Sequence, residues 1–211
     1  MTVILIIFVK VTIKKHKFIF MQGEYLHRKL SQGRIEVITG PMFSGKTEEL
    51  IRRLKRALIA RQKVVAFKHK LDNRYSEKYI ASHDEKHIES IQIETAEEIH
   101  SYINDVSVVG IDEAQFFNED LVAVCRILAN KGIRVIVAGL DMDYKGEPFS
   151  PMPSLMACSE NVLKLQAVCI KCGNPANFSH KKIISDDRVM VGATQEYEPL
   201  CRQCFNTLSL E

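Results

Sequence analysis

The sequence predicts an α/β fold in which helices flank a mainly parallel β-sheet and a small C-terminal domain follows. Two observations support this fold class. Short apolar segments typical of buried strands alternate with amphipathic segments of helical period between residues 34 and 138. Two cysteine pairs lie beyond residue 166, after this alternation ends. We therefore expect residues 34–166 and residues 167–211 to form two domains, preceded by a leader at residues 1–33.

The composition is that of an ordinary globular protein, with 46% hydrophobic and 26% charged residues in a chain of 211. The charges are unevenly spread. The first 34 residues hold seven of the 29 lysines and arginines but only one of the 26 acidic residues, so the rest of the chain is mildly acidic. This argues against a broad surface for nucleic-acid phosphates, and we expect no nucleic-acid partner.

The leader is unlike the rest of the chain. Its apolar segment, residues 3–9, is too short to span a membrane, and its basic residues follow that segment instead of preceding it as in a secretory signal. The leader is an extra strand, a tail that is disordered or touches a membrane, or upstream sequence translated ahead of a start at Met21. We favour the last alternative, and we expect a cytoplasmic protein without a membrane partner.

The first part of the α/β domain is predicted as strand, loop, helix and strand. Apolar residues mark a strand at Arg34–Thr39, and a glycine-rich loop joins it to a helix over residues 47–62. One face of this helix is apolar, with Leu50, Leu54, Ala57 and Leu58. A second strand is expected at residues 63–67.

The second part repeats the alternation. A Thr-x-x-Glu capping box opens a short helix over residues 95–103, and an apolar strand follows at residues 106–111. Asn118 can cap a helix that ends at Gly132, and the last apolar strand is residues 133–138. Apolar strands separated by amphipathic helices are typical of a parallel sheet covered on both faces.

The loop after the first strand matches the pattern G-x-x-x-x-G-K-[ST]. It consists of Gly40, Pro41, Met42, Phe43, Ser44, Gly45, Lys46 and Thr47. The glycines let backbone N–H groups face phosphates, Lys46 can reach the β- and γ-phosphates, and the Thr47 hydroxyl can bind magnesium. Because a strand precedes this loop and a helix follows it, we expect a P-loop that binds a nucleoside triphosphate, and not a chance Gly/Ser turn.

Two acidic residues end the strand at 106–111. An apolar strand that ends in an aspartate, here Asp112, is the Walker-B arrangement for magnesium. The carboxyl ends of parallel strands form a common crevice, so Asp112 is expected near residues 40–47. Glu113 can take a proton from an alcohol that receives a phosphoryl group. The alternative is that Glu113 is a solvated acid at a strand end.

Four of the six cysteines form two Cys-x-x-Cys pairs, Cys169 with Cys172 and Cys201 with Cys204. Such pairs supply four thiolates for zinc, and a site with four thiolates is structural because it has no open position for water. The zinc would close the base of the 28-residue loop between the pairs. Two disulfides are the alternative, but they fit poorly with the lack of a secretory signal. The other two cysteines, Cys125 and Cys158, are expected in the core.

Taken together, these motifs resemble those of the type II thymidine kinases, which include the cytosolic vertebrate enzyme and most bacterial ones. The resemblance extends from about Ile35 to Phe205. The segments that carry it are residues 39–47, residues 112–117, residues 139–144, Pro148-Phe149, the two cysteine pairs, and Gly192 with Tyr197.

The resemblance implies transfer of a phosphoryl group from ATP, with magnesium, to the 5′-hydroxyl of thymidine and of deoxyuridine, in nucleoside salvage for DNA synthesis. It assigns Glu113 as the catalytic base and Asp112 to magnesium. Asp72 and Arg74 match family positions at the reacting centre, where Arg74 would help to neutralise the transferred charge together with Lys46. The remaining residues that it assigns to the nucleotide site are Ala114 and Gln115.

The family also has a loop, the lasso, that closes over the base and is anchored by the zinc pairs. By position, Tyr197 contacts the nucleoside. The other residues assigned to the thymidine pocket are Met42, Phe116, Leu140, Tyr144, Phe149, Phe178 and Ser179. Each aromatic residue has a simpler interpretation as core packing. Tyr144 and Ser150 stand where family members commonly have Phe and Gly, so the fine shape of the pocket differs. A homotetramer and feedback inhibition by thymidine triphosphate (dTTP) are implied by the resemblance alone.

Two other functions would use the same motifs. A zinc-bearing P-loop ATPase acting on nucleic acid would use Glu113 to activate water, but the mild negative charge counts against it. A catalytically silent nucleotide-binding protein would not need Lys46, Asp112 and Glu113 intact. His83 and His87 are four residues apart and could share a metal on a helix, but we interpret this charged stretch as a solvated connection.

Overall fold

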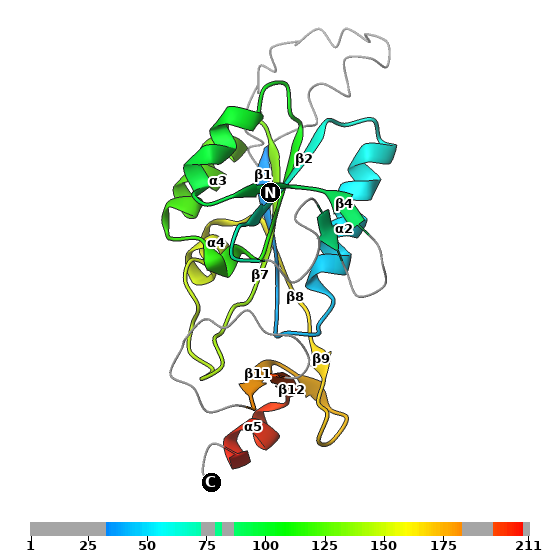
Figure 1. Ribbon diagram of the computed structural model, residues 1–211, viewed down its shortest axis with the longest axis vertical. Coiled ribbons are helices and arrows are strands. Elements are labelled where there is room, and N and C mark those ends of the chain that lie inside the picture. The colour runs from blue at the N-terminus through cyan, green and yellow to red at the C-terminus, as the bar shows by residue number, and fades with distance from the viewer. Residues whose placement is uncertain (1–32, 73–78, 82–86, 183–195, 209–211) are drawn as a thin grey trace, which may run out of the picture. The chain divides into compact units, whose positions relative to one another are not determined.

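Six parallel strands form the central sheet of the computed structural model, which describes residues 33–72, 79–81, 87–182 and 196–208 (Figure 1). Their order across the sheet is β5-β2-β6-β7-β1-β8. The bounds are β1 Arg34–Thr39, β2 Val64–His69, β5 Ile91–Ile93, β6 Val108–Asp112, β7 Arg134–Gly139 and β8 Asn161–Lys164. The predicted parallel α/β fold is therefore confirmed. The expectations for residues 1–32 and for His83 lie outside the described residues.

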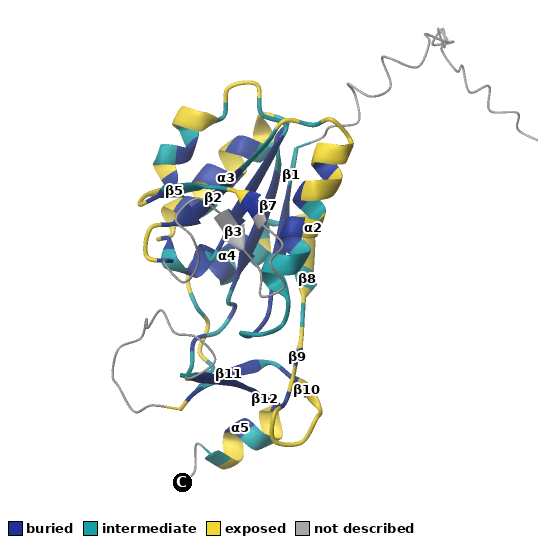
Figure 2. Cartoon of the chain, turned by 45° about the vertical axis from the view of Figure 1, so that its right-hand side comes forward, coloured by how far each residue is buried: buried dark blue, intermediate teal, exposed yellow. Residues whose placement is uncertain are grey.

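The four predicted strands are the four inner strands of this sheet, β2, β6, β7 and β1. All residues of β6 and the last five of β1 and β7 are buried, which explains their apolar sequences. The edge strands β5 and β8 have only three and four residues and are partly or largely exposed. Because they carry no long apolar run, they were not predicted from the sequence. Figure 2 shows buried residues concentrated on the inner strands.

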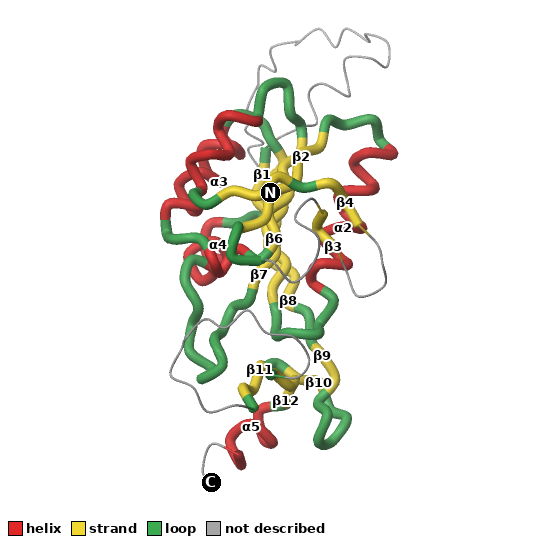
Figure 3. Tube along the Cα trace, viewed as in Figure 1, coloured by secondary structure: helices red, strands yellow, loops and turns green. Residues whose placement is uncertain are grey.

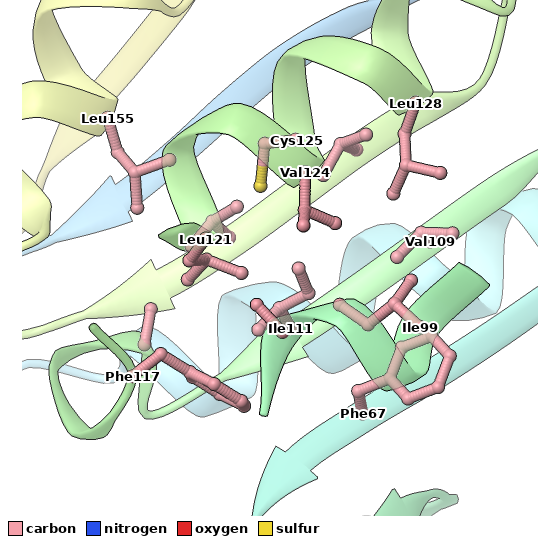
Figure 4. Close-up of a cluster of buried hydrophobic side chains, with 14 of the residues drawn as sticks. Phe67, Ile99, Val109, Ile111, Phe117, Leu121, Val124, Cys125, Leu128 and Leu155 are labelled. Carbon is pink, nitrogen blue, oxygen red and sulfur yellow. The ribbon is translucent and has the colours of Figure 1, made fainter. Parts of the chain in front are cut away.

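Each face of the sheet packs against helices. On one face, α3 (Asp120–Asn130), α4 (Met152–Cys158) and the 3₁₀ helix η1 (Ala96–Tyr102) cover the larger core. In Figure 4, Val109 and Ile111 from the strands lie opposite Leu121, Val124 and Leu128 of α3, and the Phe67 ring lies beside Ile99 of η1. On the other face, α2 (Lys46–Ile59) buries Leu50, Ile51 and Leu54 against Ile38 and Ile136. Each buried side chain of this size contributes about 1.5–3 kcal/mol to folding.

Helix α2 ends three residues earlier than predicted. Arg61 adopts a left-handed conformation with φ 58°. The N–H of Arg61 donates to the Leu58 carbonyl and the N–H of Gln62 donates to the Ala57 carbonyl. This pair of hydrogen bonds satisfies the last carbonyls of the helix, as in a Schellman motif, although an arginine occupies the position usually taken by glycine.

The other two predicted helices are present with small differences. The capping box of Thr95 and Glu98 is confirmed, but the helix it opens is a 3₁₀ helix. Helix α3 begins at Asp120, two residues after the predicted cap, and the Asn118 side-chain oxygen accepts a hydrogen bond from the Asp120 N–H at 3.2 Å. Cys125 of α3 is buried in the core and Cys158 packs against it, as expected.

The C-terminal part contains two small antiparallel sheets and one helix, drawn in Figure 3 below the central sheet. Its elements are β9 Ala167–Val168, β10 Pro175–Ala176, β11 Phe178–Lys181, β12 Tyr197–Leu200 and α5 Arg202–Leu208. A separate small core joins them, formed by Ala167, Cys169, Ala176, Phe178, Leu200, Cys201 and Phe205. A further hairpin, β3 Tyr79–Ala81 with β4 His87–Glu89, lies outside the sheets described above. Among the described helices, none has both the length and the apolar character needed to cross a membrane.

Candidate active site

The loop at residues 40–47 joins β1 to α2 in the predicted strand, loop and helix arrangement. Gly40 has φ 134°, and a Cβ there would lie 2.3 Å from the Leu165 carbonyl oxygen, so no larger residue fits. Gly45 precedes the helix with φ 82°. Lys46 Nζ and Ser44 Oγ both donate to the Pro41 carbonyl, at 2.7 and 2.8 Å. The Lys46 ammonium thus lies across the loop, where it can meet a bound phosphate.

Thr47 at the start of α2 and Asp112 at the end of β6 are brought together, as expected. The Thr47 hydroxyl donates to Asp112 Oδ2 at 3.2 Å, and Asp112 is buried. A hydroxyl and a carboxylate oxygen side by side are the hard oxygen donors that magnesium prefers, and Asp112 supplies its oxygen from the strand end next to the first turn of α2. The two residues therefore fit a magnesium ion held between loop and strand.

Glu113 is held in a constrained position directly after Asp112. Its backbone is left-handed, with φ 50° and ψ 47°, which is uncommon for a residue with a side chain. Its N–H donates to Asp112 Oδ1 at 3.0 Å. Its carboxylate accepts a hydrogen bond from Gln115 Nε2 at 2.5 Å. The Glu113 carboxylate thus contacts Gln115, whereas the Asp112 carboxylate contacts Thr47 and the Glu113 N–H, so the two acids have different partners.

Gln115 connects Glu113 to the neighbouring strand. While its amide nitrogen donates to Glu113, its oxygen Oε1 accepts a hydrogen bond from the Leu140 N–H at 3.0 Å, just after β7. Gly139 makes room for this contact, because a Cβ at that position would lie 3.0 Å from Gln115 Oε1 and 2.7 Å from Met152 Sδ. Gln115 itself is 4% exposed. The family resemblance assigns Gln115 to the nucleotide site, and nothing in the sequence indicates a contact with Leu140.

Asp72 lies buried in the turn after β2, where its N–H donates to the His69 carbonyl at 2.9 Å. Arg74, which the family resemblance places beside Asp72, lies outside the described residues. His69 was not singled out from the sequence. Its Nδ1 accepts from the Leu71 N–H, so its Nε2 carries the proton and donates to the Glu94 carbonyl at 3.0 Å. Burial lowers the pKa of His69, which keeps this arrangement neutral.

The P-loop also contacts the C-terminal part of the chain. The Met42 N–H donates to the Ser179 hydroxyl of β11 at 2.9 Å. Phe43 and Met142 pack against the small C-terminal core. A Cβ at Gly146 would lie 3.1 Å from the Phe178 ring, so the segment after β7 also approaches β11 closely. Two residues predicted for the thymidine pocket, Met42 and Ser179, are thereby in direct contact.

The other residues predicted for the thymidine pocket differ in burial. Phe116, Leu140, Tyr144 and Phe149 are half-buried, whereas Phe178 and Tyr197 are buried. Phe178 stacks on Phe205 at a ring separation of 4.5 Å, as a core residue does. Lys181 Nζ lies 4.9 Å from the centre of the Tyr144 ring, a cation–π contact that the sequence did not indicate. Contact with a nucleoside stays a prediction for all of these residues.

The four predicted zinc ligands come together in the C-terminal part. The sulfur atoms of Cys169, Cys172, Cys201 and Cys204 all lie within 4.8 Å of one another. Tetrahedral zinc with Zn–S bonds of about 2.3 Å places sulfur atoms about 3.8 Å apart. The distance between Cys172 Sγ and Cys201 Sγ is 3.6 Å, and all four cysteines are free of disulfides. The cluster therefore fits a zinc ion closely.

The surroundings of the cluster favour a thiolate. Burial opposes ionisation of Cys169, but backbone N–H groups of Cys201 and Lys171 lower its pKa to about 6. Hydrogen bonds with Cys201 and Cys172 hold the proton on Cys204 and raise its pKa to about 12. Cys169 can therefore supply a first thiolate ligand, and the binding of a metal would release the proton of Cys204.

Comparisons with known proteins agree with this geometry. The family model for thymidine kinase matches residues 33–205. The thymidine kinase of Bacteroides thetaiotaomicron is 54% identical over 187 residues, which is 89% of this chain and 94% of that protein. That of a Rhodothermus species is 57% identical over 175 residues, 83% of this chain and 82% of that protein. That of Porphyromonas gingivalis is 51% identical over 180 residues, 85% and 88% of the two chains. On this similarity, together with the P-loop, the Asp112-Glu113 pair and the cysteine cluster, the chain belongs to the thymidine kinase family.

Proposed function

We propose that this protein is an ATP-dependent thymidine kinase that transfers the γ-phosphoryl group of ATP to the 5′-hydroxyl of thymidine, forming thymidine 5′-monophosphate. Membership of the family supports the reaction. The single structural observation that supports its mechanism is the hydrogen bond from Gln115 to the Glu113 carboxylate, one residue after Asp112, which contacts Thr47 of the P-loop. Phosphoryl transfer to an alcohol requires a base and a phosphate-binding loop, and here both follow the carboxyl-terminal ends of strands in the parallel sheet.

The donor would bind to the loop at residues 40–47. Backbone N–H groups of this loop and the Lys46 ammonium would hold the phosphates and neutralise charge that develops during transfer. Thr47 and Asp112 would hold magnesium, which bridges phosphate oxygens when bound. We further propose that Asp72 and Arg74 complete the reacting centre, since they occupy the family positions for that role. Ala114 would line the nucleotide site from η2 (Ala114–Phe116).

Glu113 would act as the general base. Its left-handed backbone and its hydrogen bond to Gln115 limit the rotamers that the side chain can adopt, so the carboxylate would be oriented to accept the proton of the 5′-hydroxyl. A positioned base of this kind typically contributes about 10²–10⁴-fold to the rate. Asp112 is committed to Thr47 and to the Glu113 N–H, so it is poorly placed to share this task.

Thymidine would bind between the P-loop and the C-terminal part. The contact from Met42 to Ser179 joins these two parts, and Phe116, Leu140 and Tyr144 extend toward the same edge of the sheet from η2 and from the segment after β7. A mostly apolar slot with few polar groups suits a flat methylated pyrimidine, and deoxyuridine differs by one methyl group only. Phe149, Phe178 and Tyr197 would complete the pocket.

The zinc ion would be structural. Four thiolates leave no position for water, and the cysteines join β9, β12 and α5, the elements that flank the proposed lasso. We also propose the division into an α/β domain at 34–166 and a lasso domain at 167–211, a homotetramer, feedback inhibition by dTTP and a cytoplasmic location. These follow from the family resemblance.

The direct test is formation of thymidine 5′-monophosphate from ATP, magnesium and thymidine. The Glu113→Gln variant removes the base but keeps the size of the side chain, so we expect kcat to fall by about 10²–10⁴-fold while ATP affinity changes little. Glu97→Gln is the matched control, because Glu97 is an exposed acid on η1 remote from the P-loop.

Two outcomes would contradict the proposed activity, and a third would contradict only the role of Glu113. ATP hydrolysis stimulated by DNA, without a phosphorylated nucleoside, would indicate an ATPase that acts on nucleic acid. Binding of ATP without turnover in the wild-type protein would indicate a silent nucleotide-binding protein. Unchanged kcat in Glu113→Gln would leave thymidine kinase activity possible but would reject Glu113 as its base.

A further inference from the structure

A cavity of about 510 Å³ lies at the amino-terminal ends of β1 and β7, whereas the P-loop lies at the carboxyl-terminal end of β1. It is lined by Arg34, Glu36, Arg52, Arg53, Arg56, Arg134 and Asn161. Arg34 and Arg134 begin β1 and β7, whereas the P-loop follows the other end of β1. A six-residue strand spans about 20 Å, so this cavity is separate from the nucleotide site.

The residues that line this cavity come from the alternation of side chains along β1 and from the helical spacing of arginines on α2. Alternate residues of β1 share the face of the sheet that α2 covers. On this face Ile38 belongs to the apolar core, and Glu36 and Arg34 lie nearer the beginning of the strand. On α2, positions 52, 53 and 56 lie on one side of the helix, because residues three and four apart share a face. The apolar core under α2 therefore ends in a cluster of arginines.

Glu36 organises the inner part of the cluster. Its Oε1 accepts hydrogen bonds from Arg34 and Arg134, each at 2.7 Å, and its Oε2 accepts from Arg53 and Arg134, each at 2.8 Å. Burial would raise the pKa of Glu36, but the hydrogen bonds and charges of Arg134 and Arg34 lower it to about 2. The carboxylate is thus ionised and holds three guanidinium groups in fixed orientations.

The negative charge of Glu36 does not balance the positive charges of the arginines that line the cavity. Glu49 pairs with Arg52 and Arg53, and still the cavity keeps an excess of positive charge. Arg56 lines the cavity, but its side chain makes no hydrogen bond or ion pair with any described residue. The side chains of Arg34 and Arg52 are 42% and 55% exposed, so their remaining N–H groups face solvent. A structural ion-pair network does not need these additional donors, whereas an anion-binding site does.

We propose that this cavity binds a small multivalent phosphate anion, such as a pyrophosphate or triphosphate group. Guanidinium groups form paired hydrogen bonds with phosphate oxygens, and several of them here are already oriented by Glu36. The volume is typical of small-ligand sites. The inference is independent of the proposed kinase activity, because no residue of the cavity belongs to the P-loop, to the Asp112-Glu113 pair or to the thymidine pocket.

Titration calorimetry with inorganic tripolyphosphate tests this proposal on the full chain without ATP. We expect two binding sites per chain, because the P-loop binds one tripolyphosphate molecule and the cavity binds another. Lys46→Ala should remove the first site and leave the second. Arg56→Gln and the double variant Arg52→Gln/Arg56→Gln should weaken the second site, by at least about tenfold in the double variant, and leave the first unchanged.

Lys55→Gln is the matched control, because it removes a positive charge from the same helix next to Arg56 without touching the cavity. Binding at a single site that Lys46→Ala abolishes would overturn the proposal. So would an equal loss of affinity in Lys55→Gln, which would indicate diffuse charge attraction. Arg56 is exposed and its side chain has no hydrogen-bond or ion-pair partner among the described residues, so Arg56→Gln is expected to fold with an unchanged Tm. This single variant decides the question if the double variant does not fold.

Discussion

Gln115 donates a hydrogen bond to the Glu113 carboxylate at 2.5 Å and at the same time accepts one from the Leu140 N–H at 3.0 Å. The amide thus fixes the proposed base to the end of the neighbouring strand. Because the amide is buried and each of its ends has a different partner, its orientation cannot be reversed without losing both hydrogen bonds. We therefore regard Gln115 as a residue that positions Glu113.

Substitution of Gln115 should affect turnover in a way that depends on the new side chain. Gln115→Met removes both hydrogen bonds, and we expect kcat to fall by roughly 10- to 100-fold because Glu113 loses its orientation. Gln115→Glu keeps the acceptor for Leu140 but places a second carboxylate beside Glu113. Repulsion between them should raise the pKa that limits activity on the acidic side.

The pH dependence of kcat/KM measures this difference. The acidic limb should move to higher pH in Gln115→Glu and should stay in place in Gln115→Met. A purely structural role for Gln115 would lower activity in both variants with the same pH profile as the wild type.

The hydrogen bond from Met42 to Ser179 joins residues 137 positions apart. Ser179→Ala removes the acceptor, which typically costs about 1 kcal/mol. If this contact aligns the C-terminal part with the P-loop for thymidine binding, KM for thymidine should rise about fivefold with little change in kcat. Steady-state kinetics with thymidine varied at saturating ATP provide the measurement. Thr207→Ala, at an exposed position of α5, is the control and should change neither constant.

The cysteine cluster should be essential for the C-terminal part. Its apolar core is small, so it needs the additional stability of a bound metal. We expect Cys172→Ser or a strong chelator to remove zinc, to loosen the C-terminal part and to abolish thymidine binding, while nucleotide binding at the P-loop persists. Elemental analysis and calorimetry with thymidine and with ATP measure these effects.

The control for the zinc experiment is Cys158→Ser, which removes a half-buried thiol outside the cluster. This variant should retain zinc and thymidine binding. Thymidine binding of unchanged affinity after complete loss of zinc would show that the metal does not stabilise the nucleoside site.

Glu36 should make stability depend on pH in the acidic range. Its pKa is lowered to about 2 in the folded protein from an ordinary value of 4.5. A lowered pKa means that the unfolded state binds the proton more tightly, so this stabilisation is complete above about pH 4.5 and is lost as the pH falls toward 2. The shift corresponds to about 3 kcal/mol of unfolding free energy.

Urea unfolding between pH 6 and pH 3 tests this assignment. Glu36→Gln should be less stable than the wild type at pH 6, but it should lose less stability on acidification because it has no carboxylate to protonate. Acid effects on the cysteine cluster are common to both proteins and cancel in the comparison. Parallel loss of stability in the two proteins would show that Glu36 does not contribute to the pH dependence.

Much of the fold could be predicted because its signals are local. The strands β1, β2, β6 and β7 are apolar since both of their faces are buried, and α2 shows its buried face at helical spacing. The edge strand β8 is largely exposed and has no such pattern, so it was not predicted. The change from an α-helix to a 3₁₀ helix at η1 also has no local signature.

For the candidate site, the sequence alone determined the chemistry of its parts: a phosphate-binding loop, a strand that ends in two acids, and four cysteines at the spacing of a zinc site. These are patterns of neighbouring residues, so they can be read without coordinates. Only the tertiary structure decided which parts meet. The strand order places the end of β6 beside that of β7, which lets Gln115 reach Leu140, and it places Arg34 and Arg134 side by side at the amino-terminal ends of β1 and β7. Strand order and register depend on how distant segments pack together, and the spacing of residues along the chain does not specify them.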